Sequence, residues 1–148
     1  AKDFFIDPYQ VSYSKSFGCD CVLIILSALS IKQADEIYDE ALKNKLSVIV
    51  EVHDEQEAEY ALKYSEAIIG INNRDLKTLN ISLDNSIRMQ KKLTSHKGPL
   101  ISESGIKNKK DAQYIYDSTG IKNFLIGESI LSNPHPSKLI QEILSINL

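Results

Sequence analysis

The amino-acid sequence predicts an α/β protein built on a parallel sheet, and two observations carry this prediction. A short apolar run, a polar turn and a helix-like segment recur six times, at intervals of about 20 to 30 residues, the length of a βα unit. The run Ser47–Glu51 is free of charge until its last residue, as is typical of a strand covered on both faces. Such repeats form a parallel sheet with right-handed crossovers, either open and doubly wound or closed as a barrel.

Each predicted strand is a short apolar run, and each predicted helix follows a polar turn. The strands are expected at Asp3–Ile6, Cys21–Leu26, Ser47–Glu51, Ala67–Ile71, Leu100–Glu103 and Phe124–Ile126. The helices are expected at Pro8–Phe17, Ile31–Asn44, Glu55–Tyr64, Leu83–Leu93, Lys107–Asp117 and Ser137–Ile146. No low-complexity tract or linker interrupts this pattern. Residues 1–148 are therefore expected to form a single domain.

The bulk composition is ordinary for a globular protein and excludes several classes of partner. With 43% hydrophobic and 25% charged residues and a net charge of −3, the chain has no basic excess for nucleic acid or an anionic membrane. No apolar run reaches the roughly 18 residues of a membrane span, and the start has no signal-peptide pattern. Cys19 and Cys21 stand beside no ligand set, which favours a reducing compartment. We therefore expect a cytoplasmic protein with no nucleic-acid or membrane partner.

Polar residues follow three neighbouring predicted strands where each strand ends. Glu51 closes the third strand, Asn72 and Arg74 follow the fourth, and Glu103 closes the fifth with Ser104 directly after it. The carboxyl ends of parallel strands meet at one edge of the sheet, where α/β proteins place their chemistry. Neither the glycine fingerprint for dinucleotides nor a Walker lysine loop is present. A site built from these side chains is therefore expected at that edge.

Taken one at a time, these residues also have simpler structural explanations. Glu51 could merely cap the following helix, and Lys2, near the start of the sequence, could be a solvated lysine. Arg74 and Asp75 could form a surface ion pair of little energetic value. Gly127 could simply open a helix. The order of the motifs decides between these explanations and a functional site.

The three histidines receive no functional role from their positions. His53, His96 and His135 are scattered and stand beside no set of metal ligands. His53 is expected to be exposed or to lie behind the residues of the site. No metal site is predicted.

Five segments in one order resemble the consecutive strand motifs of the indole-3-glycerol-phosphate synthase family. They are KDFFIDPYQ, VEVHD, GINNRDL, SESGI and LIGES, and they extend over nearly the whole chain. The resemblance implies a TIM (β/α)₈ barrel of which this chain holds units three to eight, six of eight. The first two units, with an E-x-K pattern that belongs to the family's site, are expected to be missing. A truncated barrel has open sheet edges, through which self-association is predicted.

The resemblance also implies an activity, that of a carboxy-lyase in tryptophan biosynthesis. The family converts 1-(2-carboxyphenylamino)-1-deoxyribulose 5-phosphate to indole-3-glycerol phosphate, releasing CO₂ and water without a cofactor. Lys2 would be the general acid at the sugar carbonyl, and Glu51 would take part in proton transfer during dehydration. Asn72 would join Glu51 as a catalytic residue. Arg74 would bind near the anthranilate end, where a guanidinium suits a carboxylate.

The remaining site residues would hold the sugar hydroxyls and the phosphate of this small-molecule substrate. The resemblance implies that Glu103 and Ser104 contact hydroxyl groups. Gly105 and Gly127 would let backbone N–H groups approach the phosphate, which barrels commonly bind after strands seven and eight. Glu128 follows the second glycine, where many relatives have a small neutral residue. We expect only the backbone of Glu128 to face the phosphate, with its carboxylate turned away.

Two functions from different classes are compatible with these observations. The first is the synthase, for which this chain alone is expected to have negligible turnover because two βα units are missing. The alternative is a non-catalytic fragment that binds phosphate or is complemented by a partner. Phosphoribosylanthranilate isomerase, another phosphate-binding barrel, fits less well, because it needs a cysteine base and no cysteine stands at a strand end here.

Overall fold

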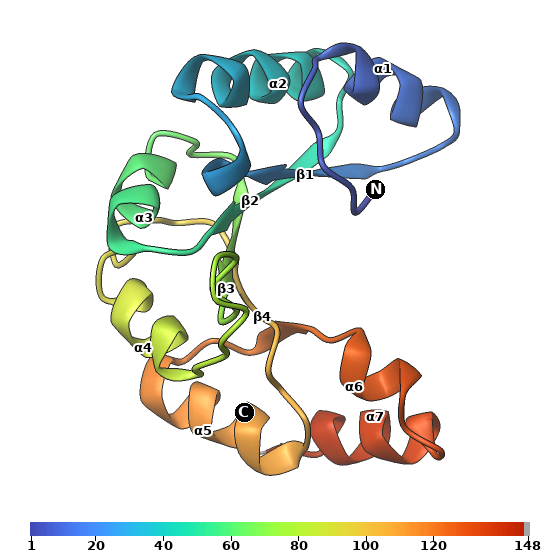
Figure 1. The fold of residues 1–148 in the computed structure, drawn as a ribbon, viewed down its shortest axis with the longest axis vertical. Coiled ribbons are helices and arrows are strands. Elements are labelled where there is room, and N and C mark those ends of the chain that lie inside the picture. The colour runs from blue at the N-terminus through green and yellow to red at the C-terminus, as the bar shows by residue number, and fades with distance from the viewer. Residues whose placement is uncertain (147–148) are drawn as a thin grey trace.

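The computed structural model describes residues 1–146 and contains a five-stranded parallel sheet (Figure 1). The strands are β1 (Cys21–Ile25), β2 (Ser47–Val52), β3 (Ile68–Asn72), β4 (Leu100–Glu103) and β5 (Asn123–Leu125). Each strand pairs in parallel with the next strand along the chain. The carboxyl ends of all five strands therefore lie along one edge of the sheet, as the repeat pattern predicts.

The helices lie outside the sheet, and the two layers together form an open arc (Figure 1). The helical segments are α1 (Tyr9–Ser16), the 3₁₀ turn η1 (Leu26–Ala28), α2 (Ile31–Lys43), α3 (Glu55–Ala61), α4 (Asp84–Gln90), α5 (Lys109–Thr119), α6 (Glu128–Leu131) and α7 (Pro136–Leu144). None of these segments of residues 1–146 combines the length and the apolar character that crossing a membrane requires. The sheet forms the inner side of the arc and faces its opening.

The hydrophobic core lies between the outer face of the sheet and the helices. In β2, Val48 and Val50 are buried in one apolar cluster with Ala58 and Ala61 of α3. Side chains alternate between the two faces of a strand, so Glu51 belongs to the opposite, inner face. Burying one valine contributes roughly 1.5–3 kcal/mol, so a register shift that exposed these valines would be costly. The core therefore determines which face of the sheet presents Glu51.

The first predicted strand, Asp3–Ile6, is not a strand in the structure. Phe5 is buried, whereas Phe4 and Ile6 expose more than half of their surface. The backbone N–H of Phe4 donates to Oδ1 of Asp3, and that of Ile6 donates to Oε1 of Gln10. Side chains close in sequence thus take the hydrogen bonds that a strand ladder would need, and this segment stays irregular.

The carboxyl-terminal part differs from the prediction in two smaller ways. Strand β5 begins one residue earlier than the predicted strand Phe124–Ile126 and ends one residue earlier as well. The four-residue helix α6, which residues 126–127 separate from β5, was not predicted. Its sequence, Glu128–Leu131, is too short to show the periodicity by which the longer helices are recognised.

Candidate active site

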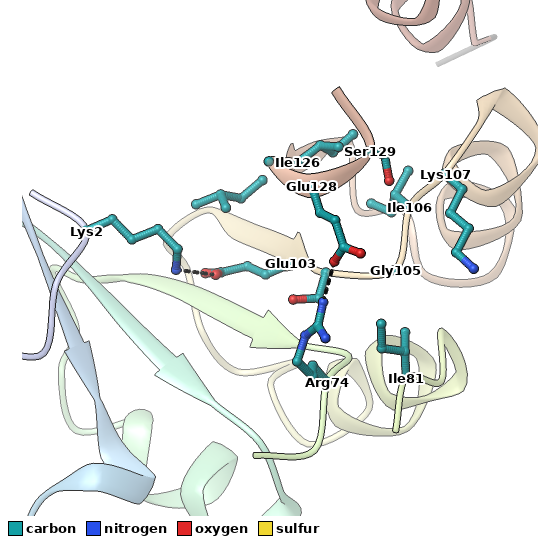
Figure 2. Close-up of a pocket in the computed structure, with 13 residues that line it drawn as sticks. Lys2, Arg74, Ile81, Glu103, Gly105, Ile106, Lys107, Ile126, Glu128 and Ser129 are labelled. Atoms are coloured by element: carbon teal, nitrogen blue, oxygen red, sulfur yellow. Dashed lines mark hydrogen bonds and ion pairs between the residues drawn. The ribbon is translucent and has the colours of Figure 1, made fainter. Parts of the chain in front are cut away.

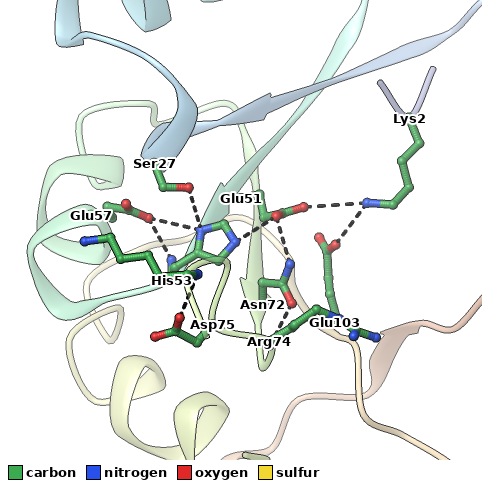
Figure 3. A network of polar contacts seen from close by, with 10 residues as sticks. Lys2, Ser27, Glu51, His53, Glu57, Asn72, Arg74, Asp75 and Glu103 are labelled. Carbon is green, nitrogen blue, oxygen red and sulfur yellow. Dashed lines mark hydrogen bonds and ion pairs between the residues drawn. The ribbon is translucent and has the colours of Figure 1, made fainter. Parts of the chain in front are cut away.

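An ammonium group and two buried carboxylates meet at the carboxyl end of the sheet (Figure 3). Nζ of Lys2 lies 3.6 Å from Oε2 of Glu51 and 3.8 Å from Oε2 of Glu103. The Lys2 side chain is 59% exposed, whereas those of Glu51 and Glu103 are 2% and 1% exposed. Lys2 comes from the irregular first segment, Glu51 from β2 and Glu103 from β4. Residues far apart in the sequence thus form one charged cluster.

The carboxylate of Glu103 fits against the sheet because its neighbour on β3 is Gly70. A Cβ atom built on Gly70 would lie 2.0 Å from Oε1 of Glu103, a distance that no packing tolerates. A glycine inside a strand often marks such a close approach. The sequence alone gave no reason to assign Gly70 to the site.

Burial and neighbouring charges act in opposite directions on the two carboxylates. Burial raises the pKa of Glu51, but His53, Asn72 and the Lys2 ammonium outweigh it, so the net shift is downward. Burial and the charge of Glu51 raise the pKa of Glu103 to about 7, even though Lys2 opposes them. Two carboxylates whose pKa values are driven apart are suited to accept and to donate a proton, respectively.

The amide of Asn72 is oriented by hydrogen bonds on both sides. Its Nδ2 donates to Oε1 of Glu51 at 2.9 Å, and its Oδ1 accepts from the backbone N–H of Arg74 at 2.9 Å. Because Oδ1 meets a donor, the amide group can only be placed with Nδ2 toward Glu51. Asn72, the last residue of β3, therefore fixes one side of the Glu51 carboxylate.

A cavity of about 310 Å³ lies beside the cluster (Figure 2). Its lining includes the predicted residues Lys2, Arg74, Glu103, Ser104, Gly105, Gly127 and Glu128. Glu51 and Asn72 do not line it and instead lie buried next to Glu103. The structure thus brings all nine predicted site residues to one edge of the sheet, seven of them around the cavity.

The carboxylate of Glu128 is directed at Arg74 across the cavity (Figure 2). Its Oε2 accepts a hydrogen bond of 2.7 Å from the Arg74 guanidinium, although 79% of the Glu128 side chain is exposed. The expectation that this carboxylate turns away is therefore wrong, because Arg74 attracts it. The alternative ion pair between Arg74 and Asp75 is not formed. Oδ1 of Asp75 instead accepts from the backbone N–H groups of Lys77 and Thr78.

The turn after β4 adopts a left-handed backbone that shapes one wall of the cavity. Ser104 has φ +66° and Gly105 has φ +82°. A Cβ on Gly105 would lie 2.5 Å from Cγ2 of Ile81, so glycine is needed for space as well as for conformation. Gly127 differs, because a Cβ there would meet nothing within 4 Å.

A buried asparagine that the sequence analysis did not select supports this turn. Nδ2 of Asn73 donates to the carbonyl oxygen of Ser104 at 3.1 Å and to Oγ of Ser102 at 3.0 Å. Oδ1 of Asn73 accepts from the backbone N–H and the hydroxyl of Ser86. All hydrogen-bonding groups of this fully buried amide are satisfied, which rigidifies the wall beside Ser104.

His53 is the other residue of the cluster to which the sequence analysis gave no role. Its side chain is only 9% exposed, and its Nε2 lies 3.0 Å from Oε1 of Glu51. Residues two positions apart on a strand point to the same side, and this spacing could have linked His53 to Glu51. Within residues 1–146, no group of three or more histidine, cysteine, aspartate or glutamate side chains is arranged to hold a metal ion.

Comparison with known proteins places this geometry in a family. The family model described as indole-3-glycerol phosphate synthase matches residues 1–143. The protein named indole-3-glycerol phosphate synthase from Acinetobacter baylyi is 42% identical over 146 residues, which are 98% of this chain and 54% of that protein. That from Acinetobacter baumannii strain AYE is 42% identical over 138 residues, 93% of this chain and 51% of that protein. The chain therefore spans about half the length of these curated relatives.

Solved structures of more distant proteins share the fold. Thiamine phosphate pyrophosphorylase from Pyrococcus furiosus matches with a TM-score of 0.67 at 20% identity, over 90% of this chain and 62% of that one. A xylose isomerase-like TIM barrel protein from Mycobacterium smegmatis matches with a TM-score of 0.63 at 12% identity, over 95% of this chain and 63% of that one. These likenesses confirm the barrel architecture, of which five parallel strands are present here. The match to the family model over residues 1–143 shows that the chain belongs to the indole-3-glycerol phosphate synthase family.

Proposed function

We propose that this chain supplies the carboxyl-terminal part of the site that converts 1-(2-carboxyphenylamino)-1-deoxyribulose 5-phosphate to indole-3-glycerol phosphate. The observation that carries the proposal is the cluster of Lys2, Glu51 and Glu103 beside an open cavity. The substrate is an anion at both ends, with a carboxylate and a phosphate. Arg74 and two glycine turns line the same cavity, which suits such a molecule.

Substrate binding divides between a side chain and the backbone. The guanidinium of Arg74 binds the carboxylate on the aromatic ring, in competition with Glu128. The backbone N–H groups near Gly105 and Gly127 bind the phosphate, and the lack of side chains at both positions leaves room for it. Ser104, between these groups and Glu103, binds a sugar hydroxyl.

The chemical steps require a proton donor at the ketone and an acid and a base for dehydration, and this chain supplies the donor at the ketone and the base, while the acid that protonates the leaving hydroxyl comes from the rest of the family site. The Lys2 ammonium, more than half exposed toward the cavity, donates to the developing oxyanion during ring closure. Glu51 is ionised near neutral pH because its pKa is lowered, so it accepts a proton during dehydration. Glu103, with a pKa of about 7, hydrogen bonds to a sugar hydroxyl in either protonation state. Asn72 keeps Glu51 in place.

This chain alone is predicted to have negligible turnover, because the family site includes residues outside it. The test is a chimera in which the amino-terminal part of the Acinetobacter baylyi relative precedes this chain. We expect the chimera to form indole-3-glycerol phosphate and the Lys2→Ala variant to lose most of its kcat. The 148-residue chain, assayed in parallel, should form no more product than a blank.

Each outcome of this experiment decides between the two functions. A well-folded chimera without turnover, together with phosphate binding by the chain, would favour the non-catalytic alternative. Turnover by the isolated chain at the rate of the chimera would contradict the view that it holds only part of the site. A Lys2→Ala chimera as active as its parent would remove Lys2 from the mechanism.

Self-association near the open edges of the sheet, at β1 and β5, and a cytoplasmic location belong to the same proposal. Helix α1 and the residue after it expose three aromatic side chains: Tyr9 stacks on Tyr13, and Tyr13 meets Phe17 edge to face. Exposed apolar groups of this kind favour contact with a second protein surface. Analytical ultracentrifugation of the chain should detect a dimer that Phe17→Ser weakens, and a concentration-independent monomer would refute this part of the proposal.

A further inference from the structure

The imidazole of His53 is enclosed by carboxylates that come from two different elements (Figure 3). Its Nε2 lies 3.0 Å from Oε1 of Glu51, and its Nδ1 lies 3.3 Å from Oε2 of Glu57 on α3. The hydroxyl of Ser27, in η1, lies 3.2 Å from the same Nδ1. The mechanism above assigns no task to this buried, titratable side chain.

The start of α3 is what holds Glu57 against the imidazole. Asp54 is the N-cap of α3, and its side chain accepts a hydrogen bond of 2.8 Å from the backbone N–H of Glu57. Oε2 of Glu57 in turn accepts from the backbone N–H of His53 at 2.8 Å. This reciprocal arrangement resembles a capping box, and it brings the same oxygen within reach of Nδ1. The start of α3 therefore places the Glu57 carboxylate next to the imidazole of His53.

The charge of this histidine follows from the carboxylates that its two ring nitrogens face. A neutral imidazole has one donor and one acceptor, whereas an imidazolium has two donors. Both ring nitrogens of His53 face carboxylate oxygens, which in the ionised form can accept hydrogen bonds but cannot donate them. Burial by itself lowers the pKa of His53, but Glu51 and Glu57 outweigh it and raise the value to about 9. The side chain is therefore a cation at neutral pH.

The two oxygens of Glu51 have different surroundings as a result. Oε1 faces Nε2 of His53 and accepts from Nδ2 of Asn72 at 2.9 Å. Oε2 has no hydrogen-bond partner within the described part of the chain, and the Lys2 ammonium lies 3.6 Å from it. Oε1 is thus held by a hydrogen bond from Asn72 and by the ion-pair contact with His53, whereas Oε2, on the side of Lys2, is buried without a hydrogen-bond partner.

We propose that His53 is a positioning residue: as an imidazolium held by Glu57, it anchors Oε1 of Glu51 and leaves Oε2 as the oxygen that accepts a proton from the substrate. This inference rests on the proposed role of Glu51 and adds which atom acts and what orients it. The charged groups facing the pair are Lys2 from the first segment, Glu57 from α3 and Glu103 from β4. His53 is the one cation among them that is both buried and fixed on two sides.

The test measures protonation rather than turnover, so it is independent of the proposed function. Long-range ¹H–¹⁵N spectra of the 148-residue chain should show both ring nitrogens of His53 protonated at pH 7.5. In His53→Gln, the pKa of the Glu51 carboxyl, followed by ¹³C spectra, should rise by about one unit or more as the cation is lost. In Glu57→Gln, the pKa of His53 should fall toward its ordinary value of 6.5.

A matched control is available on the same turn of α3. Glu55 pairs with Arg88 and Lys92 rather than with His53, so Glu55→Gln should leave both titrations unchanged. A neutral His53 at pH 7.5, or an unchanged Glu51 titration in a folded His53→Gln chain, would overturn the inference even if the chimera is active. Titrations that shift as expected in a chain whose chimera is inactive would support the electrostatic anchor and refute only the synthase activity.

Discussion

The site has a cluster of opposite charges around Lys2 and a separate ion pair at Arg74, and the carboxylates of the two differ most in their exposure to solvent. Glu51 and Glu103 are almost completely buried beside Lys2, whereas Glu128 and Arg74 meet at the mouth of the cavity with 79% and 31% of their side chains exposed. The exposed pair has the shorter contact, 2.7 Å against 3.6 and 3.8 Å. Distance alone would rank the Arg74–Glu128 pair as the stronger one.

Burial reverses this ranking. Solvent screens the Arg74–Glu128 pair, so it contributes about 0–1 kcal/mol at most. In the buried cluster the carboxylates of Glu51 and Glu103 are shielded from water, and their pKa values respond to the neighbouring charges. The pKa of Glu103 is raised to about 7 for this reason, while that of Glu51 is lowered. The buried cluster is therefore prepared for proton transfer, and the exposed pair can exchange its partner for a ligand.

The largest expected effect comes from breaking the buried cluster at Glu51. In the chimera, Glu51→Gln should lower kcat by about 100-fold or more, because a positioned acid or base typically contributes 10²–10⁴. The exposed Glu55→Gln serves as the control and should leave kcat unchanged. Steady-state kinetics combined with urea unfolding separates chemistry from folding. If the loss of kcat in Glu51→Gln is explained entirely by the fraction of protein that is unfolded, Glu51 has no catalytic role.

The buried cluster should also make stability depend on pH. The pKa of His53 is about 9 in the folded chain against 6.5 for a free histidine, so the charged form stabilises the fold below pH 6.5. That contribution is lost as the pH rises from 6.5 to 9, and the free energy of unfolding should fall by up to about 3 kcal/mol. Glu103, raised from 4.5 to about 7, acts with the same sign at lower pH.

Urea unfolding at several pH values tests this dependence. The slope between pH 6.5 and 9 should flatten in His53→Gln, which cannot titrate there. An equally steep slope in the variant would show that other groups cause the loss of stability.

Space beside Glu103 gives a third way to disturb the buried cluster. Gly70→Ala would place a methyl group 2.0 Å from the present position of Oε1 of Glu103 and force the carboxylate to move. Overpacking of this kind costs about 1–3 kcal/mol of unfolding free energy. Gly127→Ala is the control, because a Cβ there meets nothing within 4 Å. Equal urea midpoints for the two variants would mean that Glu103 moves away without cost.

The sequence predicted the parts of this site that depend on backbone periodicity. An apolar run ending in Glu51 predicts a strand, and parallel βα repeats bring Asn72 and Glu103 to the same edge as Glu51. The five strands and most helices lie within a few residues of their predicted bounds. The order of the strand motifs then indicated the family, which the comparisons confirmed.

Features that depend on contacts between distant side chains were not predictable in the same way. The hydrogen bond between Arg74 and Glu128 joins residues 54 positions apart and depends on where α6 begins. The need for glycine at position 70 becomes visible only when Glu103 lies beside it. The irregular segment Asp3–Ile6 has a strand-like sequence, but Asp3 and Gln10 take its backbone hydrogen bonds. Local pattern carries no information on these competing partners.

The smallest expected change in stability, and the sharpest test of the exposed pair, is Glu128→Ser. Because the pair is screened by solvent, the free energy of unfolding should change by less than about 1 kcal/mol. Inorganic phosphate should nevertheless bind the chain roughly three- to tenfold more tightly, since the cavity loses a negative charge and the Arg74 guanidinium is released. NMR titration at low salt measures the Kd, and Glu142→Ser, an exposed site on α7, controls for net charge. Equal phosphate affinity in Glu128→Ser and Glu142→Ser would mean that general charge, and not the Arg74–Glu128 contact, sets the affinity of this cavity.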